Sequence, residues 1–103
     1  MSIVLVATIV PVPEHRAEVI AAFEAAIARV HAEDAGCELY ALHEADDRLV
    51  MIEKWASQDA LNAHGEGAAL RELNRTLAGK VAGAPDLRVL RPHPAGTTEQ
   101  GAL

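Results

Sequence analysis

Four residues between positions 53 and 71 have side chains that could act on a substrate. His64 could accept a phenolic proton in its neutral form, because histidine titrates close to neutral pH. Arg71 could hold a phenolate or a developing peroxide anion through charge-assisted hydrogen bonds. Glu53 lies in an apolar segment, where a carboxylate either pairs with a cation or has a raised pKa. Trp55 offers a flat apolar wall with one N–H donor, which suits an aromatic ligand.

Each of these residues also has a purely structural interpretation. Trp55 could pack in the core, and His64 could be a surface histidine. Tyr40 could simply hydrogen-bond Glu53, and Arg71 could pair with a nearby carboxylate at the surface. The sequence leaves both interpretations open for each residue.

The composition excludes several classes of function. The chain has 9 Lys and Arg residues against 15 Asp and Glu residues, a net charge of −6, so binding to nucleic acid is not expected. The longest apolar run, Ile3–Val10, is much shorter than the roughly 20 residues of a membrane-spanning helix. It also lacks the basic segment that begins a signal peptide. We therefore expect neither a nucleic-acid nor a membrane partner.

Cysteine and histidine usage gives no sign of a disulfide or a metal site. The single cysteine, Cys37, cannot form an intramolecular disulfide, which favours the cytoplasm, and we interpret it as a small core residue. The remaining histidines lack the spacing of metal ligands, so no metal site is expected: His15, His31, His43 and His93.

Apolar spacing divides the chain into strands and helices. The predicted elements, in order, are a strand buried on both faces at Ile3–Val10, an amphipathic helix from Glu14 to about Asp34, strands at Cys37–Glu44 and Arg48–Trp55, a short helix after Ser57, a second helical stretch around Leu70–Leu77, and a strand at Asp86–Arg91. Gly36 is expected to close the long helix, and Gly65 and Gly67 to interrupt the short one. Residues 1–92 then form one domain, and residues 93–103 form a C-terminal tail.

The two middle strands are expected to form a hairpin around Ala45-Asp46-Asp47. If Glu44 lies opposite Leu49, the period of two places one set of side chains on the same face: Glu38, Tyr40, Leu42, Met51, Glu53 and Trp55. In this register Glu38 faces Trp55. The other face then carries Cys37, Leu39, Ala41, His43, Val50, Ile52 and Lys54.

The element order β-α-β-β-α-β predicts an α+β, ferredoxin-like fold with a four-stranded antiparallel sheet. Both helices cover one face of the sheet, so the face with Leu39, Ala41, Val50 and Ile52 stays bare. A monomer rarely exposes an apolar patch of this extent. We therefore expect a homodimer through the sheet faces, in the form of a dimeric α/β barrel.

Several motifs along these elements occur together. They are the acidic entry to the second strand (Glu33, Gly36, Cys37), Tyr40, Glu53-x-Trp55, Ser57, Ala60-Leu61-x-x-His64, and Ala7-Thr8-Ile9 in the first strand. With these motifs the chain resembles the antibiotic biosynthesis monooxygenase family over roughly residues 3–91. The resemblance implies a small dimeric ferredoxin-like protein with a pocket between sheet and helices.

The resemblance also implies where the site lies. Trp55 and Arg71 match a Trp and an Arg in the pocket of the family member that oxidises a phenolic polyketide, whereas Met51 and Leu61 stand where that member has Asn and Tyr. Asn74 stands where the haem-degrading relatives have an axial His, and Asn is a poor haem ligand. The expected catalytic residues are His64, Arg71 and Trp55, and the expected substrate-binding residues are Thr8, Tyr40, Met51, Glu53, Leu61 and Asn74.

The leading hypothesis is a monooxygenase that oxidises a quinol or polycyclic phenol with O₂ as co-substrate and no metal, haem or flavin. His64 would be the base and Arg71 the anion holder. An isomerase or processing enzyme for a small metabolite, using Glu53 and His64 without O₂, is the first alternative. A ligand-binding dimer without catalysis is the second, because a fold does not determine a function.

Overall fold

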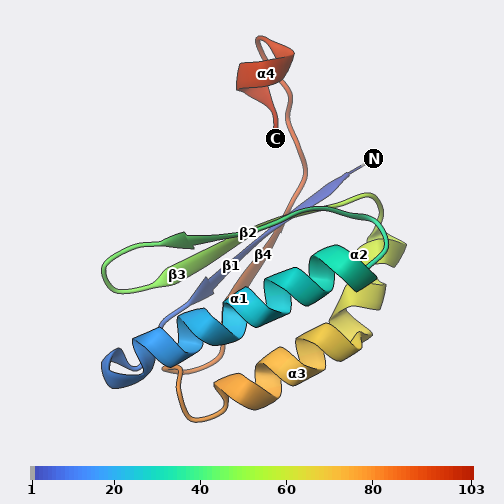
Figure 1. The fold of residues 1–103 in the computed structure, drawn as a ribbon. Coiled ribbons are helices and arrows are strands. Elements are labelled where there is room, and N and C mark those ends of the chain that lie inside the picture. The colour runs from blue at the N-terminus through green and yellow to red at the C-terminus, as the bar shows by residue number, and fades with distance from the viewer. Residues whose placement is uncertain (1) are drawn as a thin grey trace.

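The computed structural model describes residues 2–103 and contains a four-stranded antiparallel sheet with helices on one face (Figure 1). The elements are β1 (Ile3–Ile9), the 3-10 helix η1 (Pro13–His15), α1 (Arg16–Glu33), β2 (Cys37–Glu44), β3 (Leu49–Trp55), α2 (Gln58–Glu66), α3 (Ala68–Leu77), β4 (Asp86–Leu90) and α4 (Thr98–Gly101). The strand order is β2-β3-β1-β4. The predicted ferredoxin-like α+β fold is confirmed.

The core lies between the sheet and α1, as the spacing of apolar residues predicts. The long helix buries Val19, Phe23, Ala26 and Val30, which recur every three or four residues. In β1 the side chains that face the helices are buried, whereas Val6 and Thr8 on the other face are only half-buried. Val4, on the same face as Val6 and Thr8, is buried, so the prediction of a strand buried on both faces holds only for part of the strand in the single chain.

The hairpin register is confirmed from Leu39 to Glu44 and fails at the start of β2. Tyr40 pairs with Glu53 as expected, but a β-bulge between Cys37 and Leu39 pairs Cys37 with Trp55. The extra residue of a bulge leaves one position unpaired and changes the face of its neighbour. Glu38 consequently does not face Trp55, and Cys37 packs against the core instead of lying on the bare face.

Two helices follow the hairpin, divided at a single residue. Ser57 caps α2, accepting a hydrogen bond at 3.1 Å from the backbone N–H of Ala60, as predicted. Gly67 has an extended backbone and separates α2 from α3, whereas Gly65 lies inside α2. The prediction that Gly65 interrupts the helix is wrong, because a single helical glycine costs only about 1 kcal/mol relative to alanine.

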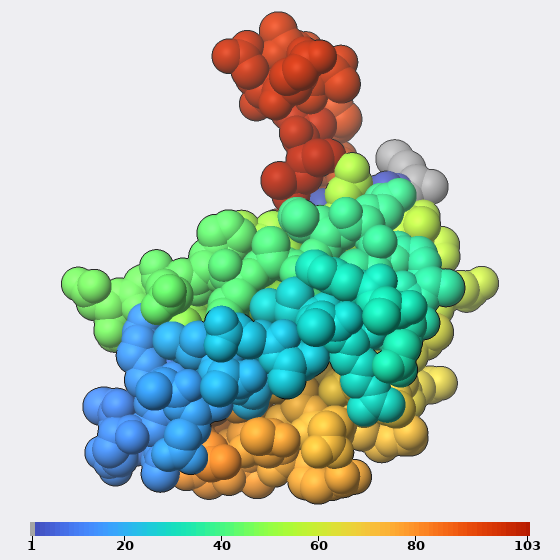
Figure 2. All heavy atoms as spheres, in the orientation of Figure 1, coloured from blue at the N-terminus to red at the C-terminus, as the bar shows by residue number. Residues whose placement is uncertain are grey.

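The tail leaves the sheet after β4 and stands off the body of the molecule (Figure 2). It contains α4, whose N-cap Thr97 accepts a hydrogen bond from the backbone N–H of Gln100. The chain end returns to the sheet, where the Lys54 ammonium donates to the Leu103 carbonyl oxygen at 2.7 Å. None of the helices in residues 2–103 has the length and apolar character needed to cross a membrane.

Candidate active site

A cavity of about 440 Å³ lies between the sheet and the helices. The lining residues come from all four strands, from α1, α2 and α3, and from Pro85 just before β4: Leu5, Ala7, Ile9, Phe23, Tyr40, Met51, Glu53, Leu61, Asn62, His64, Gly65, Glu66, Leu70, Leu73, Asn74, Leu77, Pro85 and Leu87. Most are apolar, and six have polar side chains. A volume in this range and a mostly apolar lining are typical of sites for small organic molecules.

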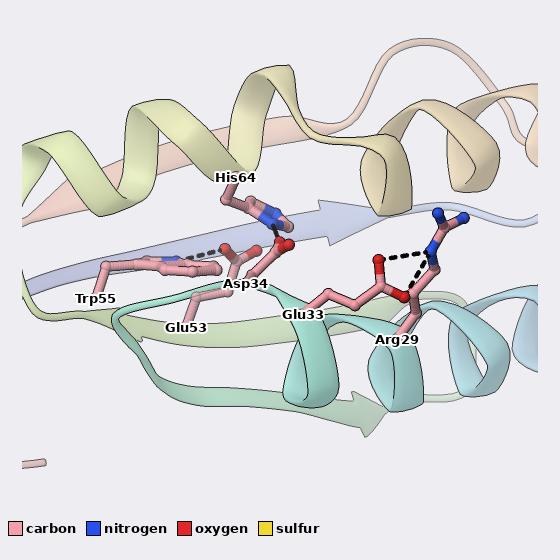
Figure 3. A network of polar contacts seen from close by, with 6 residues as sticks. All are labelled: Arg29, Glu33, Asp34, Glu53, Trp55 and His64. Carbon is pink, nitrogen blue, oxygen red and sulfur yellow. Dashed lines mark hydrogen bonds and ion pairs between the residues drawn. The ribbon is translucent and has the colours of Figure 1, made fainter.

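His64 is the residue in this cavity best arranged to accept a proton. Its Nδ1 lies 2.7 Å from Oδ2 of Asp34 (Figure 3), and only 5% of its side chain is exposed. An ionised carboxylate can only accept hydrogen bonds, so the ring proton resides on Nδ1 and a neutral ring presents Nε2 as an acceptor. Within residues 2–103, every buried side-chain N or O atom has a hydrogen-bond partner. Nε2 of His64 forms no hydrogen bond with this part of the chain, so Nε2 is not buried and is accessible at the cavity.

Asp34 is a member of the site that the sequence pattern did not predict. It is the C-cap residue of α1, and its backbone N–H donates to the Val30 carbonyl oxygen at 3.0 Å. Its side chain is 14% exposed and points toward α2. Glu33, which was expected at the acidic position of the motif, instead forms a surface ion pair with Arg29 at 3.1 Å (Figure 3). Its position two residues before Gly36, at the end of the helix, is the signal that could have identified Asp34.

Trp55 supports the site from behind the cavity. The indole stacks on the His64 ring with centroids 4.5 Å apart and an interplanar angle of 30°. Its Nε1 donates to Oε1 of Glu53 at 3.0 Å. The side chain is fully buried and is not among the cavity-lining residues, so Trp55 is not the direct wall for an aromatic ligand that the sequence suggested. It acts on the cavity only through His64 and Glu53.

Two more ionisable groups face the same cavity. Burial raises the pKa of Glu53, while the hydrogen bond from Trp55 and the proximity of His64 lower it in part. Burial also raises the pKa of Tyr40, and the nearby Glu53 adds to this effect, so the Tyr40 hydroxyl remains protonated. The Tyr40 ring meets His64 edge-on, with centroids 5.2 Å apart. Trp55, rather than Tyr40, is the donor that the structure provides for Glu53.

Six of the nine residues predicted for the site line the cavity: Tyr40, Met51, Glu53, Leu61, His64 and Asn74. Arg71 does not: its side chain is exposed on α3, between the lining residues Leu70 and Asn74 in sequence. Thr8 also does not, because it pairs with Val50 and Asp86 on the sheet face opposite the helices. The structure therefore places both Arg71 and Thr8 outside this cavity, which differs from the predicted grouping of the site residues.

The arrangement is one of proton-transfer groups. In the described part of the chain, no three His, Cys, Asp or Glu side chains converge as metal ligands would. The chemistry of the residues present is that of a base on His64, a carboxyl group on Glu53 and a phenolic donor on Tyr40.

Comparison with known proteins gives relatives of this fold. The family model of the antibiotic biosynthesis monooxygenases matches residues 2–76, and no functionally curated protein matches the chain. A proposed antibiotic biosynthesis monooxygenase from Caulobacter crescentus is 30% identical, with a TM-score of 0.82 over 86% of this chain and 87% of its own. PA3566 from Pseudomonas aeruginosa is 25% identical, with a TM-score of 0.78 over 86% and 91% of the two chains. Rv0793 from Mycobacterium tuberculosis, 22% identical, shares the fold with a TM-score of 0.84 over 94% and 100%.

Proposed function

Since this chain belongs to the antibiotic biosynthesis monooxygenase family, we propose that it oxidises a quinol or polycyclic phenol with O₂ and without a metal, haem or flavin. The observation that carries the proposal is the His64–Asp34 pair at an apolar cavity. A phenol can supply the electrons for O₂ itself once it is deprotonated, so the protein needs a base, proton donors and a cavity that excludes water.

The first step is transfer of the phenolic proton to Nε2 of His64. The ring becomes positively charged while Asp34 remains hydrogen-bonded to Nδ1, which offsets the charge that develops. The substrate becomes a phenolate with high electron density at the ring carbon para to the oxygen. The hydroxyl of Tyr40 can donate a hydrogen bond to it.

The second step joins the phenolate to O₂. The ring carbon transfers two electrons to O₂ and forms a C–O bond, and the resulting peroxide takes up the proton held by His64. Loss of the proton from the same ring carbon and cleavage of the O–O bond then give a quinone and one water. One oxygen atom of O₂ is retained in the quinone and the other leaves in water, so a phenol with a free para C–H is oxidised without another reductant.

Oxygen uptake tests this proposal. With 1-naphthol as the substrate, we expect the wild type to consume O₂, and His64→Gln to lower the rate by roughly 10²–10⁴-fold, the usual contribution of a positioned base. Gln is used because a shorter side chain would leave space beside Trp55. The Arg71→Gln variant is the control and should retain the rate, because Arg71 lies outside the cavity. Equal rates in wild type and His64→Gln would contradict the proposal.

An isomerase acting on a small metabolite is the second candidate. It is favoured by one observation: Glu53 and His64 line the same cavity, and burial keeps Glu53 protonated to higher pH than an ordinary glutamate. A base and a carboxylic acid in one cavity can move a proton between carbon and oxygen without O₂. Turnover of a ketone substrate under anaerobic conditions would favour this candidate over the monooxygenase, and ligand binding without any turnover would favour a binding protein.

A further inference from the structure

The lining of the cavity contains negative charge and no positive side chain. Its polar members are Tyr40, Glu53, Asn62, His64, Glu66 and Asn74, and no Lys or Arg is among the lining residues. Glu66 is exposed, at the end of α2, whereas Glu53 is buried. A ligand that enters therefore meets one or two carboxylates and several neutral donors and acceptors.

The Lys and Arg side chains of the chain lie outside the lining of the cavity. Six of the nine form ion pairs with carboxylates outside the cavity: Arg16, Arg29, Arg48, Arg75, Lys80 and Arg88. Lys54 donates to the carbonyl oxygen of Leu103. Arg71 and Arg91 are exposed and do not line the cavity.

A protonated His64 would not change this balance. Its Nδ1 lies 2.7 Å from the carboxylate of Asp34, so the positive ring and the negative carboxylate form a neutral pair. A carboxylate or phosphate on the ligand would lose its hydration in an apolar cavity and gain no unpaired cation in return. A neutral hydroxyl group loses less hydration and can donate to Nε2 of His64.

We infer that the cavity selects uncharged hydroxylated aromatic ligands and rejects carboxylated or phosphorylated ones, because carboxylates and no cation line it. The inference rests on the proposed function for the aromatic class of the substrate. It adds a preference for uncharged ligands: the rejection of anions depends on Glu66 and on the lack of a cation among the lining residues.

Calorimetric titration with three naphthalene probes tests the inference without turnover. The probes are 2-naphthol, 2-naphthamide and 2-naphthoate, and the last two match in shape and differ in charge. We expect 2-naphthol and 2-naphthamide to bind, and 2-naphthoate to bind at least about tenfold more weakly than 2-naphthamide. Equal or tighter binding of 2-naphthoate would overturn the inference, and so would failure of all three probes to bind.

A matched pair of variants tests the role of Glu66. Glu66→Lys places a cation at the cavity, whereas Glu24→Lys makes the same change of net charge on the exposed side of α1. We expect Glu66→Lys to raise the affinity for 2-naphthoate relative to 2-naphthamide by about tenfold, and Glu24→Lys to leave the ratio unchanged. The same gain in both variants would overturn the role of the cavity charge. The expected binding pattern without O₂ uptake would refute only the proposed oxidation.

Discussion

At the scale of single residues, the site depends on which nitrogen of His64 faces the cavity. Asp34 accepts from Nδ1 at 2.7 Å, and Trp55 supports the flat side of the ring at a centroid distance of 4.5 Å. These two contacts fix both the position of the proton and the orientation of the ring. Asp34 is therefore a positioning residue, because it acts on a substrate through His64.

Asp34→Asn tests this positioning. An asparagine can present either its oxygen or its amide nitrogen to Nδ1, so the proton is no longer held on that nitrogen. We expect kcat for O₂ uptake to fall at least about tenfold while KM changes little, as for loss of the correct tautomer. Asp34→Glu should restore part of the rate, since it keeps a carboxylate. A purely structural Asp34 would show a lower Tm in both variants and an unchanged kcat.

Glu53 gives a prediction about pH and stability. Burial raises its pKa above 4.5 in the folded chain, whereas the unfolded chain has the ordinary value. The folded state therefore binds this proton more tightly, and the resulting stability is present below about pH 4.5 and is lost as pH rises through the folded pKa. Glu53→Gln keeps an oxygen that can accept from Nε1 of Trp55 and removes the titration.

The Tm of Glu53→Gln relative to wild type should therefore increase between pH 4 and pH 7. A gain of about 1 kcal/mol would raise the Tm by roughly 4–8 °C in a domain of this size. Thermal melts of the two proteins at several pH values give the comparison, with exposed Glu24→Gln as a control whose Tm difference stays flat. A relative Tm that falls with rising pH would mean that ionised Glu53 has a stabilising partner.

At the scale of elements, the junction between α1 and β2 brings Asp34 to α2. Gly36 has φ +80°, and a Cβ there would lie 2.6 Å from the Cβ of Ala60 in α2. Its carbonyl oxygen also accepts from the backbone N–H of Ala56 at 2.8 Å. The close approach of this turn to α2 sets the distance from the C-cap residue of α1 to His64.

Two glycine substitutions separate the backbone effect from this close contact. Gly36 and Gly79 both have a positive φ, but nothing lies within 4 Å of a Cβ built at Gly79. We expect Gly79→Ala to lower the free energy of unfolding by about 1–2 kcal/mol, the cost of the left-handed conformation, and Gly36→Ala to lower it further. Urea unfolding of both variants measures the difference. Equal losses would show that the contact with Ala60 relaxes without cost.

At the scale of the whole molecule, the sheet has one covered and one bare face. Helices α1, α2 and α3 lie on one side (Figure 1), while Val6, Ala41, Val50 and Ile52 on the other side are half-buried. These four apolar side chains lie on adjacent strands, since Ile52 pairs with both Val6 and Ala41. We propose that a second copy of the chain covers this face, because a monomer rarely leaves such a patch in water.

Sedimentation at micromolar concentration tests the dimer. We expect the wild type to sediment with about twice its mass of 10.9 kDa. Ile52→Lys should shift the protein toward the monomer, because it places an unpaired charge at the centre of the interface. Ala28→Lys adds the same charge on an exposed position of α1 and should leave the dimer intact. A stable wild-type monomer at this concentration would contradict the proposal.

The local features of this protein follow from the spacing of residues along the chain. The spacing of Val19, Phe23, Ala26 and Val30 placed α1, because an α-helix returns to the same face every 3.6 residues. The short turn after Glu44 placed Glu44 opposite Leu49, and from that pair the register placed Tyr40 opposite Glu53. These features depend on the geometry of neighbouring residues along the chain.

Which chemical groups meet depends on how distant segments of the chain pack. Asp34 and His64 are 30 residues apart and come together through the packing of α1 against α2, which no local pattern specifies. The bulge at the start of β2 moved Cys37 to the core, and the rotation of α3 placed Asn74, instead of Arg71, at the cavity. A shift of one residue in the register of a strand moves its side chains to the opposite face of the sheet. One residue further along a helix, the side chain points about 100° away. The identity of the site residues therefore depends on packing angles and registers that are set only when the whole chain folds.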